Sequence, residues 1–394
     1  MRPTQSAHLT RRRLRAAGAG VVALALALAG CTGSDKPAPK AAPSTTSRPA
    51  PPPSPFQAKG LPAGLLAAVK PIYVGGAVPA SPSAAAALKA RKVTPGAKVT
   101  VVGSLGTWKK TPIAVVTSGK DVTLAVGPKW KVVGGWWPSL KVSRPSLGPG
   151  PRRVLFIGSD ARPGENPATA RGDSLHILGL DGKGRGGIVG IPRDSWVPLS
   201  TGGHGKINSA LPRGGPVAET RTVSAYTGVP LEGYVVTGFQ GFVTLVDHAG
   251  GVRLTSPRAF HDTYSQALIR KGLNILNGGQ ALAYARSRHA QPAGDFDRSL
   301  NQGRLLLAGA AGVRLAGPSR LPRLLQNSSP HVITNLSPER VLTLAATVFA
   351  TWPGGVHNRV ATGGVGMSPD GQSIVELGSA ARALFADIRD GSLR

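Results

Sequence analysis

From Val154 to the C-terminus, short apolar runs alternate with longer stretches in which apolar residues recur at intervals of three and four. Short apolar runs predict strands, and the longer intervals predict amphipathic helices. An alternation of the two is typical of an α/β domain, which we expect to span residues 150–394. Strands are predicted at 154–158, 174–180, 187–191 and 234–238. Helices are predicted at 216–227, 239–248, 278–285, 298–313, 337–350 and 374–388.

A second group of short apolar runs precedes this domain. KVTVVGSLG, PIAVVTSG, DVTLAVG and KWKVVGGWWPSL are rich in β-branched or aromatic residues and are separated by glycine and proline. This spacing predicts a small β-rich accessory module over residues 57–146. Its tryptophans, Trp130, Trp136 and Trp137, form either part of the core or a surface that stacks on sugars. No catalytic constellation is visible in the module, and its role is not readable from the pattern.

The first 31 residues have the three parts of an export signal. A basic cluster, RRRLR, is followed by an apolar run from Ala16 to Gly30 and by Cys31. This order is typical of secreted proteins, and Leu28 to Cys31 look like a bacterial lipobox with Cys31 as the lipidated residue. The run is shorter than the roughly 20 residues of a membrane-spanning helix, which favours a lipoprotein over an uncleaved anchor. Residues 32–56 then form an extended Pro-rich linker. We expect the folded part to lie outside the cytoplasm, tethered to the membrane.

The charge of the chain is unevenly distributed. The 394 residues carry a net charge of +29, and residues 1–150 contain 21 Lys and Arg but only two acidic residues. Anionic head groups and wall polymers would attract this half, at about 1 kcal/mol for each basic residue near such a surface. An Arg-rich proteome explains the same excess without a partner. Nucleic acid is not expected as a partner, because export would separate the protein from DNA. The single cysteine, Cys31, excludes an intramolecular disulfide and a cysteine-based metal site.

Charged residues flank the first three strands predicted after residue 150. VLFIG is followed by Asp160, and the next strand begins at Asp173 after a loop that contains Arg171. The third strand, GIVGI, ends before Arg193, and DGKGRG predicts a hairpin between the second and third strands. If the strands are antiparallel neighbours, these ends meet at one edge of the sheet, where α/β proteins commonly bind ligands. We therefore expect the two aspartates and two arginines to converge there.

Several downstream polar residues share spacings that place them on common faces. They are Lys206 with Asn208, Arg286 with Arg288, and Arg298 with Gln302. The planar guanidinium group suits phosphate oxygens, and two carboxylates without His or Cys suit a hard cation such as Mg²⁺. As a set these residues describe a pyrophosphate or phosphodiester site, whereas a surface ion pair explains each member taken singly.

An ordered series of motifs between Val154 and Leu307 resembles the LytR-CpsA-Psr family. The series reads VLFIGSDAR, RGDSLHIL, GIVGIPRDSWV, KINSAL, LNGGQALAYARSRH and GDFDRSLNQGRLL. Each motif alone is a modest signal, and the series is highly specific. The resemblance implies an α/β fold with a central mixed sheet flanked by helices and an apolar tunnel for a polyprenyl tail. It also implies an extracytoplasmic, membrane-anchored phosphotransferase.

The resemblance further implies that the enzyme moves a glycan phosphate from a polyprenyl-pyrophosphate carrier to peptidoglycan, typically with Mg²⁺. It assigns Asp160 and Asp173 to the metal, and it leaves open whether Asp160 instead, or also, is the general base. Catalytic roles fall to these two aspartates and Arg193. The pyrophosphate-binding residues that the resemblance implies are Arg171, Arg193, Lys206, Arg286, Arg288, Arg298 and Gln302.

The chain departs from the family pattern at several positions. Many members have RQQR where this chain reads NQGR, with Asn301 and Gly303, so one positive charge of the head-group site is missing. GDS around Asp173 replaces the commoner SDT and keeps the carboxylate. His176 and His289 are possible acid or base groups, although His176 lies within a predicted strand and is expected in the core.

Two other functions fit the same residues. One is a polyprenyl-pyrophosphate phosphatase with water as the acceptor, and the other is a non-catalytic, membrane-tethered protein that binds anionic glycopolymers. The apolar stretches FQGFVTLVDHAGGV and RLLLAGAAGVRLAG suit a lipid slot, and ordinary core packing explains them equally well. The sequence does not identify the glycopolymer, the acceptor hydroxyl or the oligomeric state.

Overall fold

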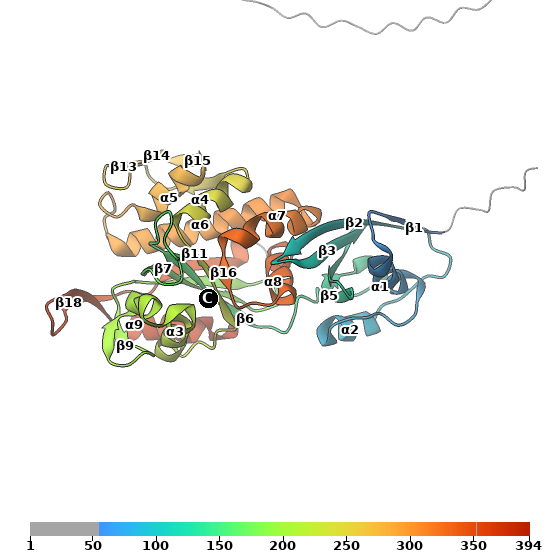
Figure 1. Cartoon of the computed structure of the whole chain (residues 1–394), viewed down its shortest axis with the longest axis horizontal. Coiled ribbons are helices and arrows are strands. Elements are labelled where there is room, and N and C mark those ends of the chain that lie inside the picture. The colour runs from blue at the N-terminus through green and yellow to red at the C-terminus, as the bar shows by residue number, and fades with distance from the viewer. Residues whose placement is uncertain (1–54, 352) are drawn as a thin grey trace, which may run out of the picture. The chain divides into compact units, whose positions relative to one another are not determined.

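The computed structural model describes residues 55–351 and 353–394 (Figure 1). The described residues belong to one compact unit that extends to Arg394. Cys31 and the predicted linker up to residue 54 lie outside the described residues, and Phe56, predicted as its last residue, begins the first strand. None of the helices in the described part of the chain is long and apolar enough to cross a membrane.

A six-stranded mixed sheet forms the centre of the fold, and four of its strands were predicted from the sequence. Its order is β16-β11-β6-β7-β8-β17. The strands are β6 (Arg152–Ser159), β7 (Gly172–Leu180), β8 (Gly186–Ile191), β11 (Gly233–Thr237), β16 (Ile333–Thr334) and β17 (Val356–Val360). β7 pairs antiparallel with β6 and with β8, while β11 and β17 run parallel to β6 and β8. Because β6 and β8 end where β7 begins, the loops that follow β6 and β8 meet the start of β7 at one edge.

Helices cover both faces of this sheet (Figure 1). Leu155, Ile157 and Ile177 face a core shared with α3 and α9. Phe156 and Leu178 alternate with them and face the opposite side, as the two-residue period of a strand requires. The helices are α3 (Ala210–Thr227), α4 (Phe239–His248), α5 (Gly278–Arg286), α6 (Asp295–Ala316), α7 (Leu321–Ser328), α8 (Pro338–Ala350) and α9 (Ser379–Asp387). α3 contains a kink at Gly214 and Gly215, and its regular part resumes at Pro216.

Four small two-stranded sheets surround the central one. Their strands are β9 (Trp196–Pro198), β10 (His204–Lys206), β12 (Val252–Ser256), β13 (Phe260–Asp262), β14 (Ala267–Ile269), β15 (Gly272–Leu276), β18 (Gly363–Met367) and β19 (Ser373–Leu377). The helix predicted at 374–388 is therefore wrong in its first part. Ile374 and Val375 pair with β18, and Gly378 separates β19 from α9. Residues 373–377 form the second strand of a hairpin with β18, and Val375 also pairs with Ser195, a contact that local periodicity does not report. Short 3₁₀ turns lie at Pro138–Leu140, Ile207–Ser209, Pro318–Arg320, Ser329–His331, Pro353–Gly355 and Ile388–Asp390.

The N-terminal part of the described chain is built on a five-stranded sheet ordered β1-β2-β3-β4-β5. The strands are β1 (Phe56–Lys59), β2 (Val99–Trp108), β3 (Thr111–Ser118), β4 (Asp121–Val126) and β5 (Lys131–Trp136). Two helices that the sequence analysis did not predict, α1 (Ala63–Val74) and α2 (Pro82–Lys89), pack on one face. The other face packs against α7 and α8. Burial on both faces explains why its strands read as continuous apolar runs.

Trp130, Trp136 and Trp137, which the sequence singled out, lie in or against the protein core. Trp137 is fully buried, and its Nε1 donates a hydrogen bond to Thr123 Oγ1 (2.8 Å). Trp130 packs on the same cluster as α1 and α2. Trp136 lies against Phe349 of α8, with ring centroids 5.9 Å apart. These contacts favour the packing interpretation over a sugar-stacking surface.

Candidate active site

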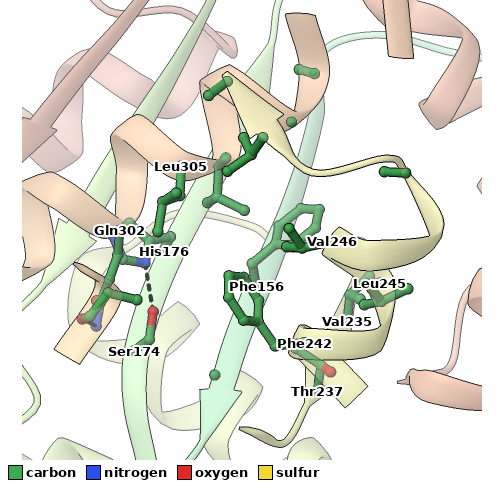
Figure 2. Close-up of a pocket in the computed structure, with 18 of the residues that line it drawn as sticks. Phe156, Ser174, His176, Val235, Thr237, Phe242, Leu245, Val246, Gln302 and Leu305 are labelled. Atoms are coloured by element: carbon green, nitrogen blue, oxygen red, sulfur yellow. Dashed lines mark hydrogen bonds between the residues drawn. The ribbon is translucent and has the colours of Figure 1, made fainter. Parts of the chain in front are cut away.

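A cavity of about 1340 Å³ opens at the edge of the central sheet where β6 ends and β7 begins. Its inner wall is apolar and lies between the sheet, α4 and α6 (Figure 2). Labelled residues on this wall include Phe156, Val235, Phe242, Leu245, Val246 and Leu305. Its polar residues include Asp160, Arg171, Asp173, Arg193, Arg286, Arg288, Arg298 and Gln302. The cavity thus joins a charged mouth to a long apolar interior.

Asp160 and Arg171 form the first charged pair at the mouth. Asp160 Oδ1 accepts the backbone N–H of Arg171 (2.9 Å), and Oδ2 accepts Nε (3.2 Å) and Nη2 (3.1 Å) of the guanidinium. These bonds close the loop between β6 and β7 on itself. The hydrogen bonds and charge of Asp160 raise the pKa of Arg171. Because the Arg171 side chain is 62% exposed, it can turn to a ligand at little cost.

Asp173 and Arg193 form the second pair. Arg193 Nη1 donates to Asp173 Oδ2 across the β7–β8 side of the mouth. Asn208 Nδ2 lies 3.4 Å from the other carboxylate oxygen. The spacing in the sequence placed Asn208 on one face with Lys206 and indicated no role for it. The 3₁₀ turn at Ile207–Ser209 directs Asn208 to Asp173. Both oxygens of Asp173 are therefore oriented by side chains that are largely shielded from solvent.

Lys206 differs from the other candidates in its position. It is not among the residues that line the cavity. Its Nζ pairs with Asp194 Oδ1 at 3.0 Å, and Asp194 Oδ2 lies 3.7 Å from Arg193 Nε. Lys206 is thus connected to the mouth through Asp194, which it holds beside Arg193.

Arg298 and Gln302 project from one face of α6, as their spacing predicted. Arg298 is buried, and its Nη2 pairs with Asp295 Oδ1 at 2.6 Å. Burial lowers the pKa of Arg298, and the positive charges of Arg193 and Arg288 add to this effect. In the described part of the chain, neither Arg193 Nε nor Arg298 Nε has a hydrogen-bond partner. A bound anion would accept hydrogen bonds from these two buried N–H groups and would reduce the repulsion between the neighbouring positive charges.

Asp262 organises the loop that carries Arg288, and the sequence analysis did not identify it. Its Oδ2 accepts hydrogen bonds from Ser287 Oγ (2.7 Å) and from the backbone N–H groups of Arg288 (3.0 Å) and His289 (3.1 Å). Burial raises the pKa of Asp262, but these and neighbouring hydrogen bonds outweigh it and hold the pKa at about 2. Arg286 begins the same loop and lies over the Phe239 ring, 5.0 Å from its centroid. No local motif connects Asp262 with a loop that lies 25 residues away.

The two candidate histidines differ in their surroundings. His176 is fully buried in β7, with Nδ1 3.2 Å from Ser174 Oγ (Figure 2) and Nε2 3.0 Å from the Ser299 carbonyl oxygen. Burial lowers its pKa to about 4, so the ring is neutral near pH 7. His289 is exposed, lines the cavity and stacks on Tyr264 with ring centroids 4.1 Å apart. The expectation that His176 belongs to the core is consistent with this placement.

The metal donors at this site are few. Among the residues that the structure describes, no three His, Cys, Asp or Glu side chains form a group that could hold a metal ion. Asp160 and Asp173 both line the mouth and offer carboxylate oxygens. Mg²⁺ often takes only one or two protein carboxylates and completes its shell with water and substrate phosphate. This donor pair therefore fits Mg²⁺ together with a phosphate ligand.

Comparison with known proteins identifies close similarity to one family. Residues 138–364 match the LytR_cpsA_psr family. The chain is 32% identical over 198 residues to "Polyisoprenyl-teichoic acid--peptidoglycan teichoic acid transferase TagV" of Bacillus subtilis, covering 47% of this chain and 50% of that protein. It is 30% identical over 198 residues to "Probable cell wall biosynthesis protein LcpB" of Corynebacterium glutamicum, covering 45% and 48%. The match thus spans about half the length of each relative.

Solved structures share the fold. The crystal structure of B. subtilis TagV superposes with a TM-score of 0.52 at 26% identity, covering 61% of this chain and 98% of that chain. Protein gbs0355 from Streptococcus agalactiae superposes with a TM-score of 0.55 at 22% identity, covering 62% and 89%. The α/β architecture expected from the sequence is thereby confirmed.

Proposed function

This chain belongs to the LytR_cpsA_psr family, and we propose that it transfers a glycan phosphate from a polyprenyl-pyrophosphate carrier to peptidoglycan. The match to TagV, a protein named as a teichoic acid transferase, supports this reaction class. This reaction requires a site that binds an anionic head group, a long apolar tail and a sugar acceptor next to one another.

The observation that carries the proposal is the continuity of the cavity from a cationic mouth to an apolar interior. Arg193, Arg286 and Arg298 line the mouth, while Phe156, Phe242 and other apolar side chains line the interior. Guanidinium groups suit pyrophosphate oxygens. An apolar interior of this size suits a hydrocarbon tail, because burial of apolar surface is the main favourable term for such a ligand. A site for a water-soluble phosphate ester would not need an apolar interior of this size.

In the proposed reaction an acceptor hydroxyl oxygen attacks the phosphorus attached to the glycan. The bond from that phosphorus to the bridging oxygen breaks, and polyprenyl phosphate leaves with the bridging oxygen. Arg193 and Arg298 would balance the charge that accumulates on the leaving phosphate. The hydroxyl proton would pass to a carboxylate, for which Asp160 is the candidate because it lines the mouth and its oxygens are oriented by Arg171.

We further propose that Asp160 and Asp173 hold Mg²⁺ together with the substrate phosphates. When bound, the cation would neutralise phosphate charge. Asp173 is oriented for this role by Arg193 and Asn208, and Lys206 contributes through Asp194. Arg171, Arg286, Arg288 and Gln302 would complete the head-group contacts.

The location outside the cytoplasm is part of the same proposal. The export-like segment and Cys31 support a lipid-anchored protein on the outer side of the cell membrane. Replacement of Cys31 by alanine is expected to move the protein out of the membrane fraction. A Cys31→Ala protein that stays in the membrane fraction would indicate an uncleaved anchor helix.

The decisive experiment measures turnover of a lipid-pyrophosphate glycan with Mg²⁺ and an oligomeric peptidoglycan acceptor. Release of polyprenyl phosphate with label on the acceptor is expected for the native protein. Asp160→Ala and Arg193→Ala are expected to reduce transfer by roughly 10²-fold or more, since each removes charge stabilisation or proton transfer at the reacting phosphate. Arg394→Ala is the matched control, because Arg394 pairs with Asp390 on the surface. Unchanged transfer in both site variants would refute the site assignment.

The same assay separates transfer from the alternatives. Polyprenyl phosphate released without label on the acceptor would mean hydrolysis, with water in place of the sugar hydroxyl. Binding of the lipid-linked glycan without any release would indicate a binding protein and would overturn the proposal.

A further inference from the structure

The interior of the cavity includes one side chain from the N-terminal sheet. Trp108, at the end of β2, lines the cavity together with residues of the central sheet and its helices. It is 4% exposed and packs in a cluster with Val154, Leu180 and Leu336. The N-terminal sheet therefore contributes to the wall of the candidate lipid site.

Trp108 belongs to a packing cluster that reaches the end of the central sheet far from the mouth. β7 begins beside Asp173 at the mouth and ends at Leu180, so the two are separated by about 23 Å at roughly 3.3 Å per residue. Leu180 and Trp108 share one cluster and both line the cavity. The indole thus belongs to the same packed wall as Leu180, whose end of β7 is opposite the charged groups.

The position of Trp108 is fixed by close packing of β2 on α7. A Cβ atom at Gly106 would lie 2.5 Å from the Pro322 carbonyl oxygen, so only glycine permits this approach. Leu321, at the start of α7, belongs to the same cluster as Trp108. The backbone that carries the indole is therefore held against the helix and does not swing freely.

Tryptophan at position 108 leaves one hydrogen-bond donor unpaired in the described structure. Trp108 Nε1 is buried and, within residues 55–394 as described, has no hydrogen-bond partner. Leucine or phenylalanine would fill apolar space without burying an unpaired N–H donor. The bulk and reach of the indole are what distinguish it from those residues.

From this placement we propose that Trp108 is the end stop of the lipid site and limits the length of the isoprenoid chain that the cavity accommodates. The inference rests on the proposed function, in that the ligand is a polyprenyl pyrophosphate. It gives the N-terminal sheet a part in substrate selection, a role that the sequence pattern did not reveal. The remaining chain of a longer lipid would have to stay outside the cavity and add nothing to affinity.

The test measures the affinity of the full-length protein in detergent for a graded series of prenyl pyrophosphates, from geranylgeranyl to undecaprenyl. For the native protein, affinity is expected to rise with each added isoprene unit and then to level off. The chain length at which it levels off is the break in the series. Trp108→Ala is expected to move this break to chains longer by one isoprene unit or more. Trp108→Phe, which keeps most of the bulk, is expected to shift it less.

The outcomes separate the inference from the proposed function. If the native protein binds no prenyl pyrophosphate, the proposed function fails. If it binds them with a clear break that Trp108→Ala leaves in place, or with no break at all, the end-stop inference is overturned. Trp108→Leu keeps apolar packing while shortening the side chain, and it replaces the alanine variant if that variant does not fold.

Discussion

Two basic side chains on the cavity wall, Arg298 and His176, show how burial acts on single residues. Burial lowers the pKa of both. The guanidinium remains charged because its ordinary pKa is far above neutrality, and Asp295 pairs with it. The imidazole loses its charge, and Ser174 and the Ser299 carbonyl satisfy both ring nitrogens. Arg298 is thus available to an anion, while His176 serves packing.

We predict that His176 makes folding stability depend on pH between about 6.5 and 4. Its pKa is about 4 in the folded protein, against an ordinary value of 6.5. The unfolded chain therefore binds a proton first as pH falls, and stability is lost through this window. The loss amounts to about 3 kcal/mol, since one pKa unit corresponds to roughly 1.4 kcal/mol. Denaturant unfolding of native protein and His176→Gln at several pH values measures it.

The glutamine variant should have a smaller slope of unfolding free energy against pH in this window. His204→Gln is the matched control, because His204 is exposed. Equal slopes for native protein and His176→Gln would show that His176 does not titrate as its burial requires.

At the scale of elements, the contact between α6 and β17 accounts for one departure from the family pattern. A Cβ atom at Gly303 would lie 2.1 Å from Asn358 Oδ1, so the helix approaches β17 closely at this point. Asn358 Nδ2 donates to the Leu300 carbonyl oxygen (2.8 Å). Asn301 is also buried, and it accepts hydrogen bonds from Tyr284 and Arg304. The NQGR sequence thus supports a packed helix–strand contact here and no extra head-group charge.

We predict that Gly303→Ala destabilises the protein by about 1–3 kcal/mol, because the added methyl group overpacks this contact. The cost should be smaller in an Asn358→Ala background, where the clashing amide is absent. Gly309→Ala is the control in the same helix, since nothing lies within 4 Å of a Cβ atom there. It should stabilise the helix by up to about 1 kcal/mol. Additive effects of Gly303→Ala and Asn358→Ala on unfolding free energy would contradict the predicted contact.

At the scale of the whole molecule, positive charge is concentrated in the N-terminal sheet and its helices. Residues 56–146 contain 13 Lys and Arg and a single acidic residue, Asp121. Asp121 is fully buried and accepts hydrogen bonds from Ser139. Lys109 and Lys110, in the β2–β3 turn, lie at the same end of the sheet as Lys129 and Lys131. Residues 56–146 therefore expose basic side chains and no carboxylate of their own, and Glu339 of α8 is the acidic residue that lies beside Lys129 and Lys131.

We predict that this surface binds anionic polymers or head groups in a salt-dependent way. A fragment of residues 53–394 should sediment with phosphatidylglycerol vesicles at low salt and be released as salt screens the charges. Replacing Lys109, Lys110, Lys129 and Lys131 by glutamine should weaken binding. The control replaces four exposed basic residues after residue 147. Equal loss in both variants would assign the effect to net charge, and binding that resists salt would contradict the electrostatic origin.

The sequence by itself determined the α/β class, four of the six strands of the central sheet and the set of polar candidates at its edge. It could do so because strand alternation and hairpin turns are local, and antiparallel pairing of neighbouring strands follows from them. The ordered motifs also identified the family.

Only the tertiary structure decided which residues act on one another across the chain. Asp262 reaches Ser287, Gly303 meets Asn358, and Val375 of β19 pairs with Ser195. Trp108 lines a cavity whose mouth is formed by segments that follow it in the chain. These contacts depend on packing between distant segments, which local periodicity does not encode. The charged loop between β6 and β7 was readable in sequence, whereas the inner end of the cavity was not.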